Sequence, residues 1–157
     1  MDQLAELRKV ARIIVGALIA GLLFFCILVF FIDRNKAEAD FALTMKQFIT
    51  IFAIGYVVVA IVASLVITKF VHKKTPMAGD APTEQDIVSA HVQYQTELII
   101  RSSILEGAGF FSVVAFLIDH NYLSLICVAA CLFFLALNFP RENAHLYGIQ
   151  RRLTDRS

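Results

Sequence analysis

The 157-residue sequence is poor in charge and contains no tryptophan. Only 17% of its residues are charged and 59% are hydrophobic, whereas a soluble domain is usually about half apolar. Its formal net charge of +1 does not supply the basic face that nucleic-acid binding requires. Without tryptophan, an aromatic belt at a membrane surface has to use tyrosine and phenylalanine. This composition favours a protein whose partner is the lipid bilayer, with no nucleic-acid partner.

The sequence also lacks the residue patterns of a metal centre or a catalytic site. Cys26, Cys127 and Cys131 all lie inside apolar runs, and no CxxC motif or histidine cluster accompanies them. Metal sites need several converging donors, so we predict no metal and no cofactor, and we interpret the cysteines as small buried apolar residues. His91 is interpreted as a surface histidine. No nucleophile–base pair or phosphate-binding loop is apparent, so we do not expect an enzyme.

Four long apolar runs dominate the chain. A bilayer core requires about 20 apolar residues per helix. Runs near this length cover residues 13–32, 48–68, 98–118 and 122–139. Because backbone groups in lipid must be hydrogen-bonded internally, each run should be a helix. We therefore predict an all-α integral membrane protein with four transmembrane helices, the first retained as an anchor because no small-residue cleavage site follows it.

The basic residues predict the orientation of these helices. Lysine and arginine gather before the first run, after the second and after the fourth: Arg8, Lys9, Arg12, Lys69, Lys73, Lys74, Arg141, Arg151, Arg152 and Arg156. Cytoplasmic loops carry the excess of such residues, so both termini are predicted to be cytoplasmic. The expected location is the inner (plasma) membrane, multi-pass, with a eukaryotic organelle membrane as the alternative.

The chain is predicted to form one membrane domain with two cytoplasmic parts. Residues 72–97 combine a linker containing proline and glycine with an extension of the third helix, which is predicted to begin with Thr83 as its N-cap. A helix from there to residue 118 is about 50 Å long, more than the bilayer needs. Residues 140–157 are the predicted cytoplasmic tail, with a helix near 143–153.

The first and third apolar runs resemble each other. Residues 18–35 align without gaps to residues 104–121, with seven identities over 18 positions, and both segments end in Asp-x-Asn. A duplication predicts two tandem helical hairpins, as in membrane proteins built from parallel repeats. Coincidence between two phenylalanine-rich runs is the alternative.

Glu106 is the most informative residue because it lies inside an apolar run. Ionisable residues at that depth are costly and are usually functional. Ser102 and Ser103 lie four and three residues before it, on the same side of a helix. Desolvation disfavours a charged carboxyl group, so Glu106 should bind and release a proton near physiological pH. With Tyr56 as a candidate partner from the second run, Glu106, Ser102, Ser103 and Tyr56 form the predicted ion-binding site.

Two neighbouring features are interpreted structurally. Arg101 lies five residues from Glu106, about 140° around a helix, and is better placed to pair with Glu97. Small residues allow membrane helices to approach closely. The predicted helix-packing residues are Gly16, Ala17, Ala20, Gly21, Gly107 and Gly109.

The segment from Ile99 to Phe111, continuing to Ile118, resembles the carboxylate helix of rotary ATP synthase proteolipids, the c-ring subunits. In that family an acidic residue lies amid small residues, often with an aromatic residue one turn later, and binds the transported H⁺ or Na⁺. The resemblance covers residues 97–119 and implies that Glu106 is the ion carrier.

Two functions follow from these observations. The first is a subunit of a larger membrane complex, or a homo-oligomer, in which Glu106 binds H⁺ or Na⁺. The alternative is a purely structural or assembly subunit, in which Glu106 is a hydrogen-bonding residue of helix packing.

Overall fold

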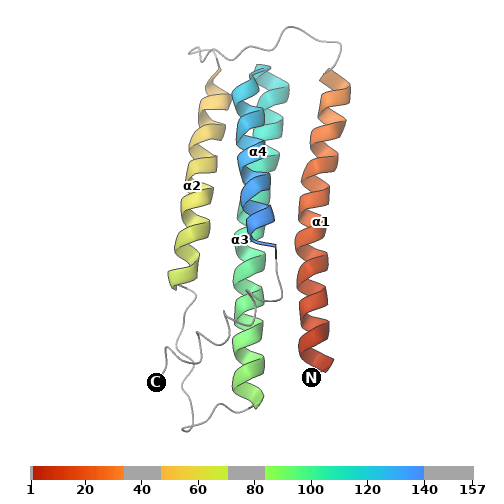
Figure 1. Cartoon of the computed structure of the whole chain (residues 1–157). Coiled ribbons are helices and arrows are strands. Elements are labelled where there is room, and N and C mark those ends of the chain that lie inside the picture. Colours follow the sequence, from red (N-terminus) through yellow and green to blue (C-terminus); the bar gives the residue numbers. More distant parts are fainter. Residues whose placement is uncertain (1, 34–46, 71–83, 140–157) are drawn as a thin grey trace.

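The protein is a bundle of four α-helices in the part of the chain that the structure, a computed structural model, describes: residues 2–33, 47–70 and 84–139. The helices are α1 (Asp2–Asp33), α2 (Phe48–Phe70), α3 (Glu84–Asp119) and α4 (Tyr122–Leu137). No strand occurs in these ranges (Figure 1), and the all-α prediction is confirmed. The predicted linker at 72–82, the Thr83 cap and the tail at 140–157 lie outside the described residues.

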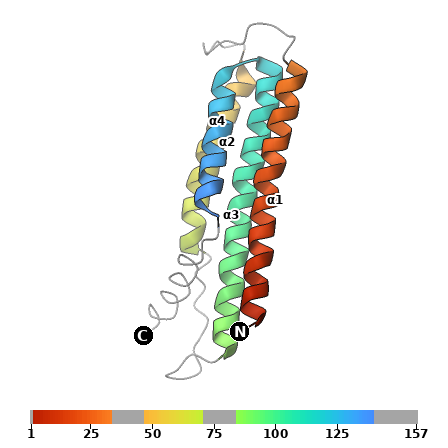
Figure 2. The ribbon, with the colours of Figure 1, turned by 45° about the vertical axis from the view of Figure 1, so that its right-hand side comes forward.

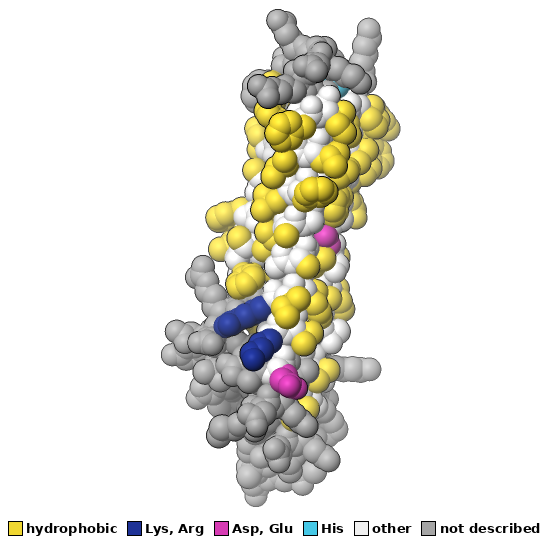
Figure 3. All heavy atoms as spheres, turned by 90° about the vertical axis from the view of Figure 1, so that its right-hand side faces the viewer, with side chains coloured by type: hydrophobic (Ala, Val, Ile, Leu, Met, Phe, Trp, Pro, Cys, Tyr) yellow, Lys and Arg dark blue, Asp and Glu magenta, His cyan; other side chains and the backbone are white. Residues whose placement is uncertain are grey.

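Three of the helices are long and apolar enough to cross a membrane. Their apolar segments are Lys9–Ile32, Phe48–Ile67 and Val88–Asp119. Helix α4 is also apolar but has 16 residues, about 24 Å, and ends two residues before the predicted limit of 139. Many large hydrophobic side chains are exposed, among them Ile13 at 69% and Phe24 at 67%. Such an apolar surface is suited to lipid, and Figure 3 shows it above a zone of charged side chains.

Helix α3 lies at the centre of the bundle. It packs against all three other helices, whereas no Cα atom of α1 lies within 8 Å of a Cα atom of α2 (Figures 1 and 2). The predicted tandem hairpins were α1–α2 and α3–α4, and of these two pairs only α3 and α4 pack against each other. The reason lies in α3, where Ala108 has a small side chain and Gly109 has none, so that α2 can approach at the first and α1 at the second.

Three clusters of buried side chains hold the helices together. Leu22, Leu105 and Val128 represent the largest, which joins α1, α3 and α4. A second joins α2, α3 and α4 through Val57, Ala60, Ala108 and Cys131. A third, made of Ala11, Val15 and Leu98, joins the first halves of α1 and α3. All three cysteines are free thiols, and Cys131 is fully buried while the other two are partly buried.

A polar cluster fixes the end of the bundle where α3 turns into α4. The carboxylate of Asp119 accepts hydrogen bonds from the backbone N–H of Thr50, at 2.7 Å, and from its hydroxyl, at 2.8 Å. Thr50 lies in the first turn of α2, so Asp119 caps that helix from another element and faces its positive dipole end. Since the Thr50 hydroxyl proton is used by Asp119, the hydroxyl of Ser124 donates to Thr50 across 3.2 Å.

Asn121 connects the same turn to α2. Its Oδ1 accepts from the backbone N–H of Leu123, at 2.8 Å, and so caps α4, while its Nδ2 donates to Gln47 Oε1 at 2.7 Å. His120, which lies between Asp119 and Asn121, adopts a positive φ of 47°. The Asp-x-Asn sequence at 119–121 thus serves as a capping device. Residues 34 and 35 of the aligned copy lie outside the described residues.

We predict that replacing Thr50 by valine destabilises the protein by about 1–3 kcal/mol, because a buried hydroxyl that serves both Asp119 and Ser124 is lost. The measurement is thermal or denaturant unfolding in detergent micelles. Thr96→Val is the matched control, since the exposed Thr96 hydroxyl bonds only the Val92 carbonyl of its own helix; its effect should stay within about 0.5 kcal/mol. Equal effects of the two substitutions would contradict the capping role.

Candidate functional site

Glu106 lies where α3 passes α1. Its Oε1 atom is 3.8 Å from the position that a Cβ atom on Gly21 would occupy. The side chain is partly buried, so it reaches the edge of the contact between the two helices. Ala20, which aligns with Glu106 in the internal repeat, precedes Gly21 in α1, and its side chain is exposed. Because Gly21 has no side chain, the space beside the carboxyl group of Glu106 stays open.

No hydrogen bond or ion pair joins Glu106 to another described residue. An ionised carboxylate without a partner is costly in apolar surroundings. A carboxyl group in this position therefore requires a proton, a cation or a donor from another molecule. The chain does not use Glu106 as a hydrogen-bonding link between its own described helices.

The two serines near Glu106 occupy different environments. Ser102 is fully buried, and its hydroxyl has no hydrogen-bond partner in the described part of the chain. Ser103 is exposed. Because the two hydroxyl groups point to different sides of α3, the structure does not gather them with Glu106 into one ligand shell.

Tyr56 lies on the other side of α3 from α1. Its ring packs edge-on against Phe111, with centroids 5.7 Å apart, and its hydroxyl oxygen is 3.8 Å from a Cβ position on Gly107. No hydrogen bond joins it to Glu106. Among the described residues there is also no group of three or more histidine, cysteine or acidic side chains that could hold a metal ion.

Beside Tyr56 there is an apolar groove that the sequence did not reveal. It has a volume of about 720 Å³ and is lined by Ile51, Phe52, Gly55, Tyr56 and Val59 of α2 and by Gly107 and Phe111 of α3. The glycines at 55 and 107 are exposed and deepen the groove. Gly107 follows Glu106 directly, so the groove adjoins the carboxylate segment from the α2 side. Its only signal in the sequence was the pair of glycines.

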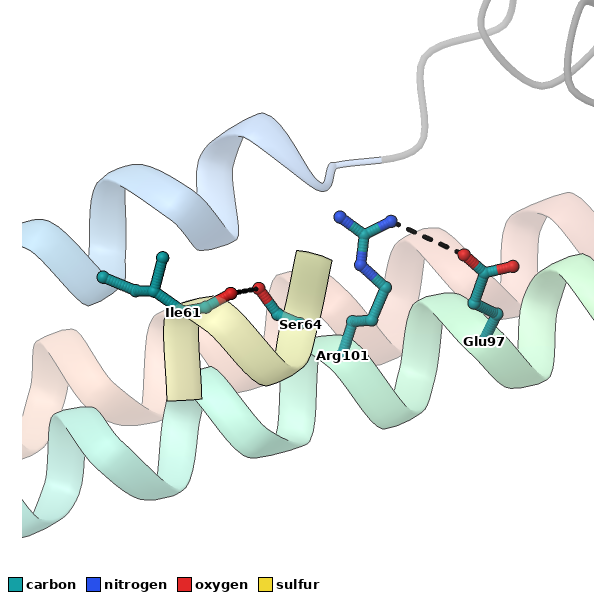
Figure 4. A network of polar contacts seen from close by, with 4 residues as sticks. All are labelled: Ile61, Ser64, Glu97 and Arg101. Carbon is teal, nitrogen blue, oxygen red and sulfur yellow. Dashed lines mark hydrogen bonds and ion pairs between the residues drawn. The ribbon is translucent and has the colours of Figure 1, made fainter. Parts of the chain in front are cut away.

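The predicted ion pair between Arg101 and Glu97 is confirmed. Arg101 Nη1 lies 3.6 Å from Glu97 Oε1, and the Glu97 side chain is buried, with 3% exposed (Figure 4). The two residues lie one helical turn apart, and Arg101 precedes Glu106 by five residues. Glu97 is therefore the paired carboxylate of α3 and Glu106 the unpaired one.

The interpretation of His91 as a surface residue is wrong. Its side chain is 1% exposed, and its Nε2 atom lies 3.3 Å from Nε2 of Gln95. His91 shares a helix face with Tyr94 and Leu98, which pack against α1. Helix α1 begins at Asp2, well before the apolar run at 13–32, and Ala11 of this extension packs in one cluster with Leu98 and Tyr94.

The predicted helix-packing residues differ in how closely a neighbouring helix approaches them. A Cβ atom on Gly109 would lie 2.5 Å from Cδ2 and 3.1 Å from Cδ1 of Leu22, whereas one on Gly16 would meet nothing within 4 Å. Ala17 and Ala20 are exposed. The close approach of α1 and α3 therefore depends on Gly109, which lies one turn after Glu106.

No protein-family model, no curated protein and no solved structure matches this chain. These comparisons do not identify an ATP synthase proteolipid, and the function has to be inferred from the chain's own geometry.

We predict that Gly109→Ala destabilises the bundle by about 1–3 kcal/mol, because the fully buried Leu22 side chain would have to shift to admit the added methyl group. Gly16→Ala is the matched control: it adds the same methyl group to an open position and should be neutral or slightly stabilising. Thermal unfolding of the two variants in the same detergent measures the difference. A Gly109 variant as stable as wild type would show that α1 does not pack so closely.

Proposed function

We propose that this protein is a subunit of a larger membrane complex, or of a homo-oligomer, in which Glu106 binds a proton or Na⁺ inside the membrane. The observation that carries the proposal is the unpaired, partly buried carboxyl group in an apolar helix. Ionisable residues in such places usually belong to ion pathways or relays. The resemblance of residues 97–119 to proteolipid helices supports the same role.

The depth of Glu106 follows from helix geometry. Arg101 and Asp119 are 18 residues apart on α3, about 27 Å, which matches a hydrocarbon core of about 30 Å. Glu106 then lies about 8 Å from the level of Arg101 and about 20 Å from the level of Asp119. With four spans and both termini in the cytoplasm, the shorter path for an ion leads to the cytoplasmic side.

Between the two ions, the geometry favours the proton. A proton needs only one carboxyl oxygen, whereas Na⁺ needs several oxygens, and Ser103 and Tyr56 do not converge on Glu106. A Na⁺ site would require ligands from a second subunit.

The second candidate is an assembly subunit in which Glu106 bonds to a helix of another subunit. The apolar groove next to Gly107 and the exposed surface around Ser103 favour this reading, because small residues admit a neighbouring helix. A membrane-buried hydrogen bond of this kind contributes about 0.6–2 kcal/mol. In that case Glu106 is sealed by its partner and does not exchange ions.

The test is labelling of the full-length protein in detergent with a hydrophobic carbodiimide, between about pH 5 and 9, with and without Na⁺. The reagent modifies protonated carboxyl groups in apolar surroundings. We expect modification at Glu106 that falls as the pH rises, since only the protonated acid reacts. Protection by Na⁺ would assign Na⁺ as the ion, and its absence would assign H⁺.

The side chains of Glu106, Glu97 and Tyr56 provide the controls for this labelling experiment. Glu106→Gln should abolish the labelling, and the buried, ion-paired Glu97 should not react. Tyr56→Phe should leave the labelling unchanged, because Tyr56 makes no hydrogen bond with Glu106. Absence of labelling at every pH would reject the ion-binding role and leave the assembly subunit.

A further inference from the structure

A small cavity lies where α4 ends beside α3. It has a volume of about 170 Å³ and is lined by Tyr94, Glu97, Leu98 and Arg101 of α3 and by Leu137, Asn138 and Phe139 at the end of α4. The cavity exists because α4 stops after 16 residues, whereas α3 continues past it towards Glu84 (Figure 1). Figure 4 shows the Arg101 side chain rising from α3 towards the end of α4.

Two hydrogen-bond donors on residues that line this cavity lack an acceptor. Arg101 Nε and Asn138 Nδ2 are inaccessible to solvent and have no hydrogen-bond partner in the described part of the chain. A buried donor without an acceptor costs about 1–3 kcal/mol. Since both unused groups are donors, the cavity is complementary to a ligand that supplies acceptor oxygens.

The charges favour an oxyanion. The guanidinium group has five N–H donors, and its contact with Glu97, at 3.6 Å, leaves most of them for a second acceptor. Arginine also matches the geometry of phosphate oxygens with paired donors. Because Glu97 offsets the charge of Arg101, the site suits a singly charged anion, such as a phosphate diester, better than a multiply charged one.

The position of the cavity favours a lipid as the source of that anion. Arg101 lies about 27 Å along α3 from Asp119, which is the distance between the two edges of the hydrocarbon core. At the same level of the bundle, α1 carries the exposed Lys9 and the partly buried Arg12, next to Ala11, which packs on α3. Figure 3 shows lysine and arginine side chains directly below the hydrophobic surface. Basic pockets between helices at this level are suited to lipid headgroups.

We propose that this cavity binds the phosphate group of a phospholipid, with Arg101 and Asn138 as hydrogen-bond donors. The side chains of Leu98, Leu137 and Phe139 line the apolar part of the cavity and contact the glycerol and the first acyl carbons. A bound lipid then fills the space that the short α4 leaves open, and it supplies the acceptors that Arg101 Nε and Asn138 Nδ2 lack.

The experiment measures lipid binding to the full-length protein in detergent by native mass spectrometry, with the melting temperature as a second readout. The probes are phosphatidylglycerol, a galactosyl diacylglycerol without phosphate, and inorganic phosphate. We expect phosphatidylglycerol to bind and to raise the melting temperature. Asn138→Ala removes the side-chain amide, and Arg101→Lys replaces the planar five-donor guanidinium with a three-donor ammonium; both keep the net charge, and each should weaken binding about tenfold or more.

Lys9→Gln is the matched control, because it removes an exposed charge near the same level without touching the cavity; lipid binding should then change less than about threefold. Binding of inorganic phosphate with the same dependence on Arg101 and Asn138 would support the site and assign a free anion as its ligand. The proposal is overturned if both cavity variants bind phosphatidylglycerol as the wild type does, or if the galactolipid binds equally well.

Discussion

The packing of α1 and α2 onto opposite sides of α3 is the constraint on which the rest of the structure depends. It is made by Ala108, with its small side chain, and Gly109, which has none; they admit Val57 of α2 on one side and Leu22 of α1 on the other. No Cα atom of α1 lies within 8 Å of one of α2, so both helices are positioned by their packing on α3 and α4. Glu106 precedes Gly109 by one turn and is therefore held against α1 at Gly21.

The polar groups of the bundle differ in how well they are satisfied. At the end near Asp119, the buried side chains of Thr50, Ser124 and Asn121 have partners, so this cluster is structural. At the other end, Arg101 and Asn138 carry buried donors without acceptors. Polar groups buried in a protein normally find a partner, which makes the second end a place for a ligand.

Glu106 lies between these two ends and has no partner among the described residues. A proton carrier needs such a position, because a carboxyl group engaged in a stable internal hydrogen bond exchanges its proton less readily. It also needs contact with a second subunit or with water, and the partial exposure at the edge of the α1–α3 contact provides the opening. The apolar surface of α1 and the groove beside Gly107 offer the area over which another subunit would pack.

Local features of this protein were determined by its sequence. The apolar runs specify helices because lipid leaves the backbone no other partners, and the spacing of Glu97 and Arg101 specifies their ion pair through the period of a single helix. The presence of a carboxyl group within an apolar stretch also follows from the sequence alone.

Contacts between helices were decided only by the tertiary structure. The two predicted hairpins, the surface location of His91 and the approach of Tyr56 to Glu106 all required knowledge of which helix faces meet. The structure instead places Tyr56 on Phe111, buries His91, and caps α2 with Asp119, a residue 69 positions beyond Thr50. The physical reason is that in an apolar medium hydrophobicity does not select one helix face over another; the fit of small and large side chains does, and it depends on both helices at once.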